Sequence, residues 1–284
     1  MPNIARLRQD LQTTKNLGDV VDVLKTAAMI QFRVFQSKEI SPQKDFARIA
    51  EECLGVLFAK GANHPYLFDR KGLATAVVII TTDEGFLGEL NTLLVNIGTD
   101  MLKSKNDKII VLGERGARYL EDLGLQYTLF PGITDEIKYK EVAGLRDYLL
   151  RGFRRDFGRI SIVYPRYFSV AVQRVEVLNL LPYLKRPQEI KLNDYLLKEL
   201  LIEPSLRIVL ESLVNMWAGF KLTEIFWTAK LAEYGARIMH LEGSTQELSH
   251  LNHKLSLDYF RSVHTLKDKS IREISASKNM IGRK

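Results

Sequence analysis

The residues best placed to do chemistry stand in a loop, Thr82–Gly88. A short apolar run rich in β-branched residues, Ala76–Thr81, precedes this loop, and a helical pattern follows it. A phosphate binds well where a strand leads into the N-terminus of a helix. However, the loop contains neither a Walker A sequence nor the dinucleotide fingerprint, and Asp83 and Glu84 would repel a phosphate. We therefore favour a structural turn in which Thr82 or Asp83 caps the following helix.

The histidines offer a second possible site. Four of the five stand near the C-terminus, and Glu247 with His250 has the Glu-x-x-His spacing of di-iron sites in helical bundles. Such a site needs a second copy of the motif and further glutamates from other helices, and the sequence contains no second copy. A polar helix face is the favoured interpretation, and we predict no metal and no cofactor.

The chain also lacks the marks of an autonomous catalyst. It has no Gly-x-Ser-x-Gly motif, and Cys53, its only cysteine, stands in the apolar stretch Cys53–Leu57, where we expect it to pack in the core. A single cysteine excludes an internal disulfide and suits a reducing compartment. No catalytic residue is predicted.

The bulk composition is that of a globular protein with a basic balance. Of the 284 residues, 41 are Lys or Arg and 34 are Asp or Glu, which gives a net charge of +7. This charge suggests an anionic partner, such as nucleic acid, a membrane surface or an acidic protein. No apolar run reaches the roughly 18 residues that span a bilayer, and the N-terminus has no apolar core of a secretory signal.

The N-terminal segment, from Ile4 to about Leu57, has a helical pattern. Ser41–Pro42 either kinks this helix or begins a second one. The apolar stripe continues with a small phase slip after its first four members. Its members are Ile4, Leu7, Leu11, Thr14, Leu17, Val20, Leu24, Ala27 and Ala28.

The middle of the chain alternates between buried strands and helices. Strands are predicted at 76–81, 109–112, 160–164 and 174–180, and helices at 88–103, from 116 to about 123, and at 138–157. Such alternation predicts a mainly parallel sheet with right-handed crossovers.

The last segment is one very long helix. Glu203–Pro204 opens it, with the proline expected in the first turn, and the pattern holds from Leu206 to about Ser277. A sustained heptad of a and d positions predicts a coiled coil. These positions are Leu231, Tyr234, Ile238, Leu241, Thr245, Leu248, Asn252, Leu255, Tyr259, Ser262 and Leu266. The helix would be on the order of 100 Å long and needs a partner, for which the N-terminal helix is the only candidate of comparable length.

The predicted fold class is therefore α/β, with an antiparallel coiled coil of long N- and C-terminal helices and an inserted Rossmann-like α/β domain. We predict an N-terminal coiled-coil helix at 1–60, the α/β domain at 70–200 and a C-terminal coiled-coil helix at 204–278.

In this order, the motifs resemble those of the F-type ATP synthase gamma subunit over nearly the whole chain. Thr81–Asn91 is similar to the family's T-S-D-x-G-L-C-G-G-L-N, and Gly113–Gly116 is similar to its G-x-K-G. The N-terminal helix of the family is matched at Ile4, Leu7, Arg8, Leu11, Asn16, Ala27, Ala28 and Arg33. Its Y-N-x-F, L-L-P and E-P segments are echoed by Tyr164, Phe168, Leu180–Pro182 and Glu203–Pro204. The C-terminal motifs are matched at Glu233, Ala236, Arg237, Ser244, Thr245, Leu257, Tyr259, Arg261, Ile271, Glu273 and Ile274.

Several motif positions depart from the family. The departures are Phe260, Val263, His264, Ser270, the segment Ser277–Met280 in place of a Gly-Ala tail, and Met29–Gln31 in the alanine-rich stretch. In the family these positions contact the catalytic ring, so the departures suggest a diverged member or a paralogue of a specialised rotary ATPase.

The resemblance implies a rotor without an active site of its own. In the family, ion flow turns a membrane ring and the gamma subunit turns with it inside a hexamer of alpha and beta subunits, whose beta subunits carry catalysis. The implied partners are the alpha and beta subunits, the epsilon subunit and the rotor ring, on the cytoplasmic face of a bacterial inner membrane. The candidate contacts with the hexamer are Arg8, Lys15, Arg33, Arg237 and Arg261, with Ile271 and Ile274 as an apolar bearing.

Two other function classes remain open from the sequence. The basic charge leaves room for a coiled-coil scaffold or nucleic-acid-binding protein, for which salt-dependent DNA binding would speak. A nucleotide-binding α/β enzyme with helical arms is the third class, for which stoichiometric ATP binding would speak. For each candidate contact residue, an exposed charge without consequence is as good an interpretation.

Overall fold

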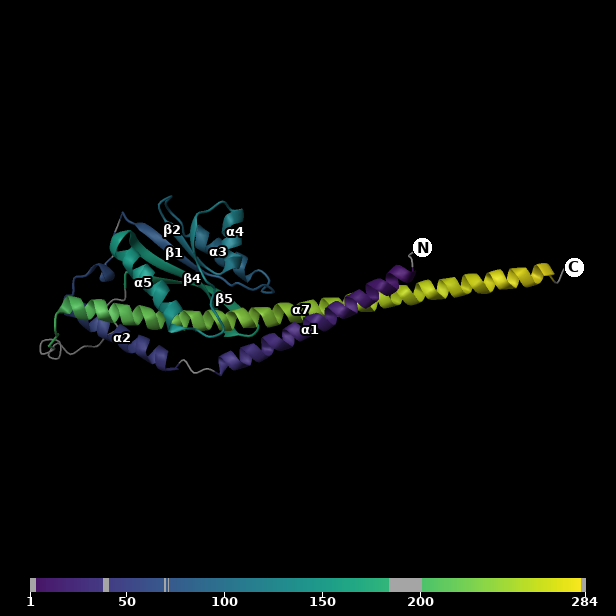
Figure 1. Cartoon of the computed structure of the whole chain (residues 1–284), viewed down its shortest axis with the longest axis horizontal. Coiled ribbons are helices and arrows are strands. Elements are labelled where there is room, and N and C mark those ends of the chain that lie inside the picture. The colour runs from purple at the N-terminus through teal and green to yellow at the C-terminus, as the bar shows by residue number, and fades with distance from the viewer. Residues whose placement is uncertain (1–3, 38–40, 69, 71, 184–200, 282–284) are drawn as a thin grey trace. The chain divides into compact units, whose positions relative to one another are not determined.

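The computed structural model describes residues 4–37, 41–68, 70, 72–183 and 201–281, and the chain divides into two compact units. One unit contains residues 31–237, and the other pairs residues 1–30 with residues 238–284. The two longest helices, α1 (Ile4–Gln36) and α7 (Leu206–Ile281), contribute to both units (Figure 1).

A five-stranded sheet organises the larger unit. Its strand order is β3-β2-β1-β4-β5, in which β5 is antiparallel to β4 and all other neighbours are parallel. The strands are β1 (Ala74–Ile80), β2 (Lys108–Leu112), β3 (Tyr127–Phe130), β4 (Phe157–Ser169) and β5 (Val172–Leu181). The predicted mainly parallel sheet is confirmed.

Helices cover both faces of this sheet, which explains the continuous apolar strands. Ala76, Val78 and Ile80 of β1 belong to one buried cluster, and Val77 and Ile79 belong to the other. The first cluster includes side chains of α2 (Ser41–Ala59), α5 (Tyr139–Arg155) and the first part of α7. The second lies under α3 (Leu90–Asp100) and α4 (Glu114–Asp122). Each fully buried Leu or Ile contributes about 1.5–3 kcal/mol to folding.

The N-terminal part of α7 is a core helix of the sheet rather than a free arm. Leu210, Val214, Leu222 and Phe226 are buried in the same cluster as β1 and α5. The indole of Trp217 also donates to Glu51 of α2, at 3.2 Å. The α/β unit is thus completed by the helix that forms the end of the chain.

Some helix boundaries differ from the predicted ones. A second helix, α2, begins at Ser41, which is one of the two alternatives that the sequence left open. Pro204 precedes α7 instead of standing in its first turn, and Ser205 caps the helix, because its hydroxyl accepts from the backbone N–H of Ile208 at 3.3 Å. Residues 184–200, at the end of the predicted α/β domain, lie outside the described residues.

Two further predictions were wrong. Cys53 is exposed, because Ala50, Leu54 and Leu57 of α2 face the core and Cys53 lies at the edge of that face. The strand β3 was missed, since it has only four residues, lies at the sheet edge and has no fully buried side chain.

Candidate functional site

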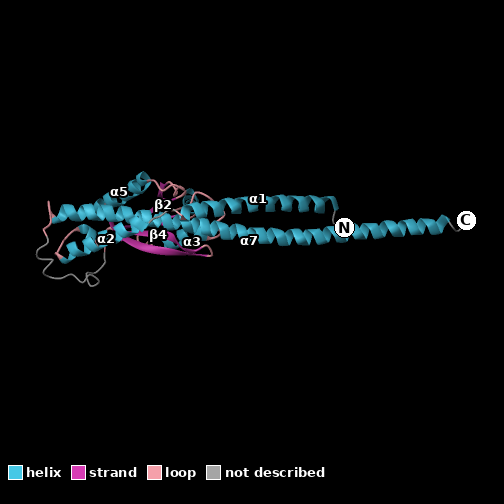
Figure 2. Cartoon of the chain, turned by 90° about the horizontal axis from the view of Figure 1, so that it is seen from below, coloured by secondary structure: helices cyan, strands magenta, loops and turns pink. Residues whose placement is uncertain are grey.

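The smaller unit is a pair of antiparallel helices. Lys25 of α1 donates to Glu242 of α7 at 3.1 Å, and Thr245 of α7 donates to Asp22 of α1, also at 3.1 Å. Asp22 precedes Lys25 by three residues, and Thr245 follows Glu242 by three residues. The two bonds therefore define the antiparallel register of the helices. Figures 1 and 2 both show α1 alongside α7.

The buried face of α1 keeps one heptad phase to its end. Leu17 and Val20 are 51% and 56% exposed, so the predicted phase slip was wrong. The sequence misled because Gly18 and Lys25 do not look like seam residues, although both lie on the less exposed face. The seam is formed by Ile4, Leu7, Leu11, Thr14, Gly18, Val21, Lys25 and Ala28.

The predicted heptad of α7 is confirmed as its less exposed face as far as Ser262. The register places Ile4 opposite Val263, so the remaining turns of α7 extend past the end of α1 (Figures 1 and 2). Every residue from His264 to Ser277 is exposed. We call this segment, 264–281, the single-helix tip.

The seam of the helix pair contains polar groups. Lys25 bonds Asp22 of its own helix at 3.1 Å as well as Glu242, so one ammonium joins the two helices. The hydrogen bonds from Lys25 and Thr245 lower the pKa of Asp22. On α7, the amide oxygen of Asn252 is buried and has no hydrogen-bond partner in the described part of the chain. Polar seam residues fix register at some expense of stability.

The structure places the predicted contact residues apart, and no bond joins any two of them among the described residues. Arg8, Lys15 and Arg33 are exposed on α1. Arg261 is exposed on α7, where its guanidinium lies 3.7 Å from Asp258. Ile271 and Ile274, in the single-helix tip, are 60% and 56% exposed.

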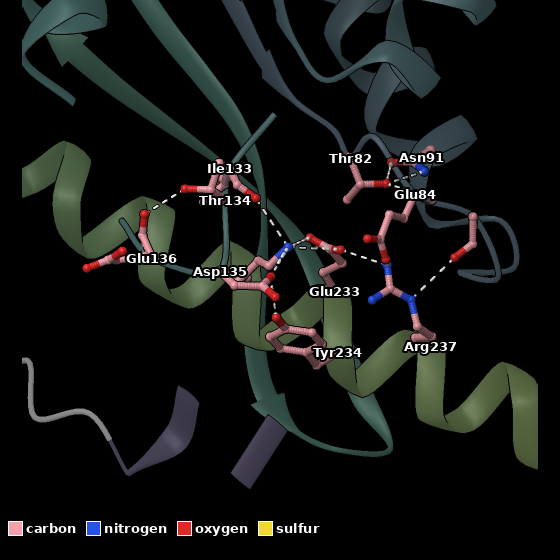
Figure 3. A network of polar contacts seen from close by, with 12 residues as sticks. Thr82, Glu84, Asn91, Ile133, Thr134, Asp135, Glu136, Glu233, Tyr234 and Arg237 are labelled. Carbon is pink, nitrogen blue, oxygen red and sulfur yellow. Dashed lines mark hydrogen bonds and ion pairs between the residues drawn. The ribbon is translucent and has the colours of Figure 1, made fainter. Parts of the chain in front are cut away.

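Arg237, the remaining candidate, is buried in a polar network of the α/β unit (Figure 3). Its guanidinium bonds Glu233 at 2.8 Å and Glu84 at 2.9 Å, and it donates to the carbonyl of Gly85 at 3.4 Å. Glu84 and Gly85 belong to the loop after β1. This arginine therefore has internal partners that the sequence did not predict.

Lys230, which precedes Glu233 by one turn, connects the same helix to a second loop. Its ammonium lies 3.1 Å from both Asp135 and Glu233, and it donates to the carbonyl of Ile133 at 3.2 Å. Tyr234 donates to Asp135 at 2.5 Å. Asp135 and Ile133 belong to the loop between β3 and α5, so α7 is bonded to two loops at the carboxyl edge of the sheet.

Glu233 is the central acceptor of this network. It is almost wholly buried between Lys230 and Arg237. Burial raises the pKa of the Glu233 carboxyl, and the charges and hydrogen bonds of the two cations oppose that rise. Burial also raises the pKa of Tyr234, and the hydrogen bond to Asp135 acts in the same direction. Because these groups bond one another within the protein, the network is suited to holding a helix in place.

The Thr82–Gly88 loop is a structural turn, as its residues suggested, but its capping partner is different. Asp83 accepts from the backbone N–H of Glu114 at 2.9 Å and so caps α4 instead of α3. Thr82 bonds Asn91 of α3 at 3.0 Å. The prediction that either residue caps α3 directly was wrong, because α3 begins only at Leu90. With Arg237 bonded to this loop, the chain's own helix occupies the edge where a nucleotide would bind in other open α/β sheets.

The histidines predicted to form a polar helix face lie on α7. His250, His253 and His264 are exposed on α7. Within the described ranges, no group of three or more His, Cys, Asp or Glu side chains is arranged to hold a metal ion. In the same ranges, no helix combines the length and the apolar character that crossing a membrane requires.

Lys230, Asp135 and Tyr234 were not identified from the sequence as members of this polar network. A signal was present, because Lys230, Glu233 and Arg237 are spaced to lie on one side of a helix among apolar neighbours such as Leu231 and Ala236. Charges with that spacing within an otherwise buried segment indicate an internal network. Their partners on the loops could not be found without the structure.

Comparisons with known proteins agree with this geometry. A family model described as ATP synthase matches residues 3–277. The chain is 24% identical to an ATP synthase gamma chain of Desulforamulus reducens over 279 residues, covering 96% of this chain and 97% of the relative. It is 22% identical to that of Akkermansia muciniphila over 286 residues, with 98% of each covered.

The fold is also similar to a solved structure. A chain in the cryo-EM structure of the Euglena gracilis mitochondrial ATP synthase rotor, rotational state 1, superposes with a TM-score of 0.68 at 19% identity, covering 93% of this chain and 98% of that one. The family match over residues 3–277 shows that the chain belongs to the ATP synthase family.

Proposed function

We propose that the chain is the central-stalk gamma subunit of a rotary F-type ATP synthase. It would couple ion-driven rotation to ATP synthesis, and ATP hydrolysis to rotation in reverse. The observation that carries this proposal is the antiparallel helix pair that ends in the single-helix tip. The relatives named ATP synthase gamma chain and the superposed rotor chain support it.

The geometry suits such work because the helix pair is asymmetric. Two helices side by side have no rotational symmetry matching a surrounding ring, so each ring subunit would meet a different face of the pair. Turning the pair would then change the conformation of each catalytic site in sequence. The coupling ion would be a proton or a sodium ion.

The exposed residues supply candidate contacts with the surrounding hexamer. Ile271 and Ile274 would turn within an apolar collar. Basic side chains would attract acidic loops at long range rather than form strong pairs. These basic side chains are Arg8, Lys15, Arg33, Arg237 and Arg261. Arg237 would serve chiefly through its internal bonds, since little of its side chain is exposed.

The proposal assigns catalysis to the partners. The chain itself would be non-catalytic, and its partners would be the alpha, beta and epsilon subunits and the membrane rotor ring. It would lie peripherally on the cytoplasmic face of a bacterial inner membrane. Residues 4–30 and 238–281 would form the shaft, and residues 31–237, which include α2 and the first part of α7 within the predicted terminal segments 1–60 and 204–278, would form the domain beside the ring.

A pull-down from native membranes tests the proposal. The tagged chain is purified under mild detergent, and the eluate is examined by mass spectrometry and by ATPase assay, with untagged membranes as the control. Recovery of alpha, beta and epsilon subunits with ATPase activity is the expected result. Recovery of the chain alone, or with nucleic acid, would contradict the proposal.

A further inference from the structure

The polar network ties α7 to the sheet at two separate points. We call it the loop clamp and define it as Lys230, Glu233 and Arg237 of α7 with Asp135 and Glu84 of the two loops; Figure 3 labels all of these residues except Lys230. Lys230 holds the loop after β3 and Arg237 holds the loop after β1. Glu233 bonds both cations, so the two attachments are linked through one carboxylate.

The loop clamp stands where α7 leaves the α/β unit. That unit ends at Arg237, which is also the last residue of the clamp. On α1 the boundary falls after Ile30, and Phe32 and Phe35 follow it at once. Both helices are therefore held within two turns of the boundary, on the side of the α/β unit.

Aromatic contacts fix α1 to the α/β unit, whereas ion pairs fix α7. The ring of Phe32 lies 5.7 Å from that of Tyr167, and the ring of Phe35 lies 6.1 Å from Trp227 and 6.0 Å from Tyr234. Tyr234 also donates to Asp135 at 2.5 Å. One tyrosine of α7 thus contacts both α1 and a loop of the clamp.

The three α7 members of the network are buried, whereas the loop carboxylates of Asp135 and Glu84 are 60% and 72% exposed, so its advantage is mechanical rather than energetic. Desolvation offsets much of the attraction between buried charges, so apolar residues of similar volume would often give equal stability. Hydrogen bonds are directional, however, and two loops bonded to successive turns oppose rotation of the helix about its axis. The hydrophobic effect itself has no preferred direction, so these bonds add a directional restraint to the resistance that packed side chains already give.

We propose that the loop clamp is the joint through which twisting load passes between the sheet and α7. This inference rests on the proposed rotor function. Under load, the two loops hold α7 at a fixed rotation, so that a turn of the α/β unit becomes a turn of the shaft. Without load, the apolar core is sufficient to hold the helix, and rotation proceeds.

The test compares loaded and unloaded work by the same complex. Lys230→Met with Asp135→Asn removes the ion pair of one attachment and leaves an acceptor for Tyr234, and Glu84→Gln weakens the other attachment at an exposed side chain whose loss leaves the core intact. The matched control is Arg166→Met with Glu176→Gln, which removes an ion pair of 2.9 Å between β4 and β5 that does not involve α7. Arg237 is left unchanged because it is also a candidate contact with the hexamer.

Each variant is assembled into the complete complex in proteoliposomes. ATP hydrolysis by the detached catalytic sector measures unloaded turnover, and the ion gradient built by ATP hydrolysis measures loaded work. Both clamp variants should keep unloaded hydrolysis and build a several-fold smaller gradient per ATP, whereas the control matches the wild type. Lys230→Arg with Asp135 unchanged retains the ion pair, so this variant should build the same gradient as the wild type.

The results distinguish a failure of the loop clamp from a failure of the proposed rotor function. If the wild-type chain assembles and pumps but the Glu84→Gln and Lys230→Met/Asp135→Asn variants pump equally well, the loop clamp carries no load. If the control variant loses as much pumping as the clamp variants, the loss is not specific to α7, and the proposal that the loop clamp carries load is wrong. If the wild-type chain itself does not assemble with the catalytic subunits, the rotor function is wrong.

Discussion

Lys25 and Glu242 stand 217 positions apart in the sequence, yet the Lys25 ammonium lies 3.1 Å from the Glu242 carboxylate. This bond joins the two terminal helices and, with the bond between Asp22 and Thr245, defines their register. The same ammonium also lies 3.1 Å from Asp22, so a single seam lysine serves both helices.

Reversing one charge of this pair should loosen the helix pair. Glu242→Lys places a second cation beside Lys25 and should lower the melting temperature of the chain more than Glu242→Gln. The double exchange Lys25→Glu with Glu242→Lys should recover only part of the loss, because the carboxylate introduced at position 25 would then face Asp22. Circular dichroism melts of the four proteins provide the measurement, and equal melting temperatures would contradict the assigned register.

Replacing the buried seam amide should stabilise the chain. Asn252→Leu removes a buried oxygen that has no partner among the described residues, and it adds apolar surface to the seam, so we expect a gain of about 1–2 kcal/mol. Urea unfolding measures this gain. Asn252→Asp is the comparison, since it keeps the shape and adds a charge, and it should destabilise. A loss of stability in Asn252→Leu would show that the amide is needed in the seam.

Stability should fall in mild acid because of His64. Its Nδ1 accepts from the backbone N–H of Tyr66 at 3.3 Å, and its Nε2 lies 3.2 Å from Glu211. Burial lowers the pKa of His64, and the hydrogen bond to Glu211 opposes this only in part. The nearby charges of Arg154 and Arg207 lower it further.

A lowered pKa means that the folded chain binds fewer protons at His64 than the unfolded chain. The contribution is therefore present above the ordinary histidine pKa of about 6.5 and is lost as the pH falls through the folded pKa. His64→Asn keeps an acceptor for the Tyr66 N–H and does not titrate. Between about pH 7 and about pH 5, the wild type should lose more stability in urea unfolding than this variant. Parallel losses would contradict the prediction.

Alanine substitutions at two glycines should change the stability of the chain in opposite directions. Gly113 has φ +93°, and a Cβ there would lie 2.8 Å from the Thr82 backbone, so Gly113→Ala should cost about 2–4 kcal/mol. At Gly144, within α5, an alanine Cβ would meet no atom within 4 Å, so Gly144→Ala should stabilise by about 0.5–1 kcal/mol. Chemical unfolding of both variants gives the comparison, and a harmless Gly113→Ala would refute the close approach of the two loops.

Truncating the single-helix tip should separate folding from function. Ending the chain at Thr265 removes a segment whose residues are exposed as far as Ser277, so the melting temperature of the isolated chain should stay the same. Coupling of ATP hydrolysis to ion pumping in the assembled complex should weaken, because Ile271 and Ile274 are lost. A large fall in melting temperature would mean that the tip packs against the chain itself.

The strands of the α/β unit could be predicted from sequence because of their residue types. A run such as Val77–Ile80 is short, β-branched and apolar at every position, which is typical of a strand covered on both faces. The edge strand β3 lacked this signal, since its side chains are partly exposed.

The helix pair and the loop clamp could be predicted only in part. The seam of α1 includes Gly18 and Lys25, whose residue types hide the heptad, whereas Leu17 and Val20 are apolar and exposed. Cys53 misled in the same way, because an apolar neighbourhood in sequence does not show which face of a helix is buried. Asp135 and Glu84 acquire their partners through long-range contacts that no local pattern encodes.

The central claim, that this chain rotates, is tested most directly by watching it turn. Cys53 is the only cysteine and is exposed, so it offers a single attachment point for a bead. The chain is assembled with its alpha and beta subunits, the hexamer is fixed to a surface, and ATP is added under a microscope. We predict stepwise rotation of the bead in one direction, at a rate that rises with ATP concentration. ATP hydrolysis by the fixed complex with a stationary or randomly moving bead would contradict the claim.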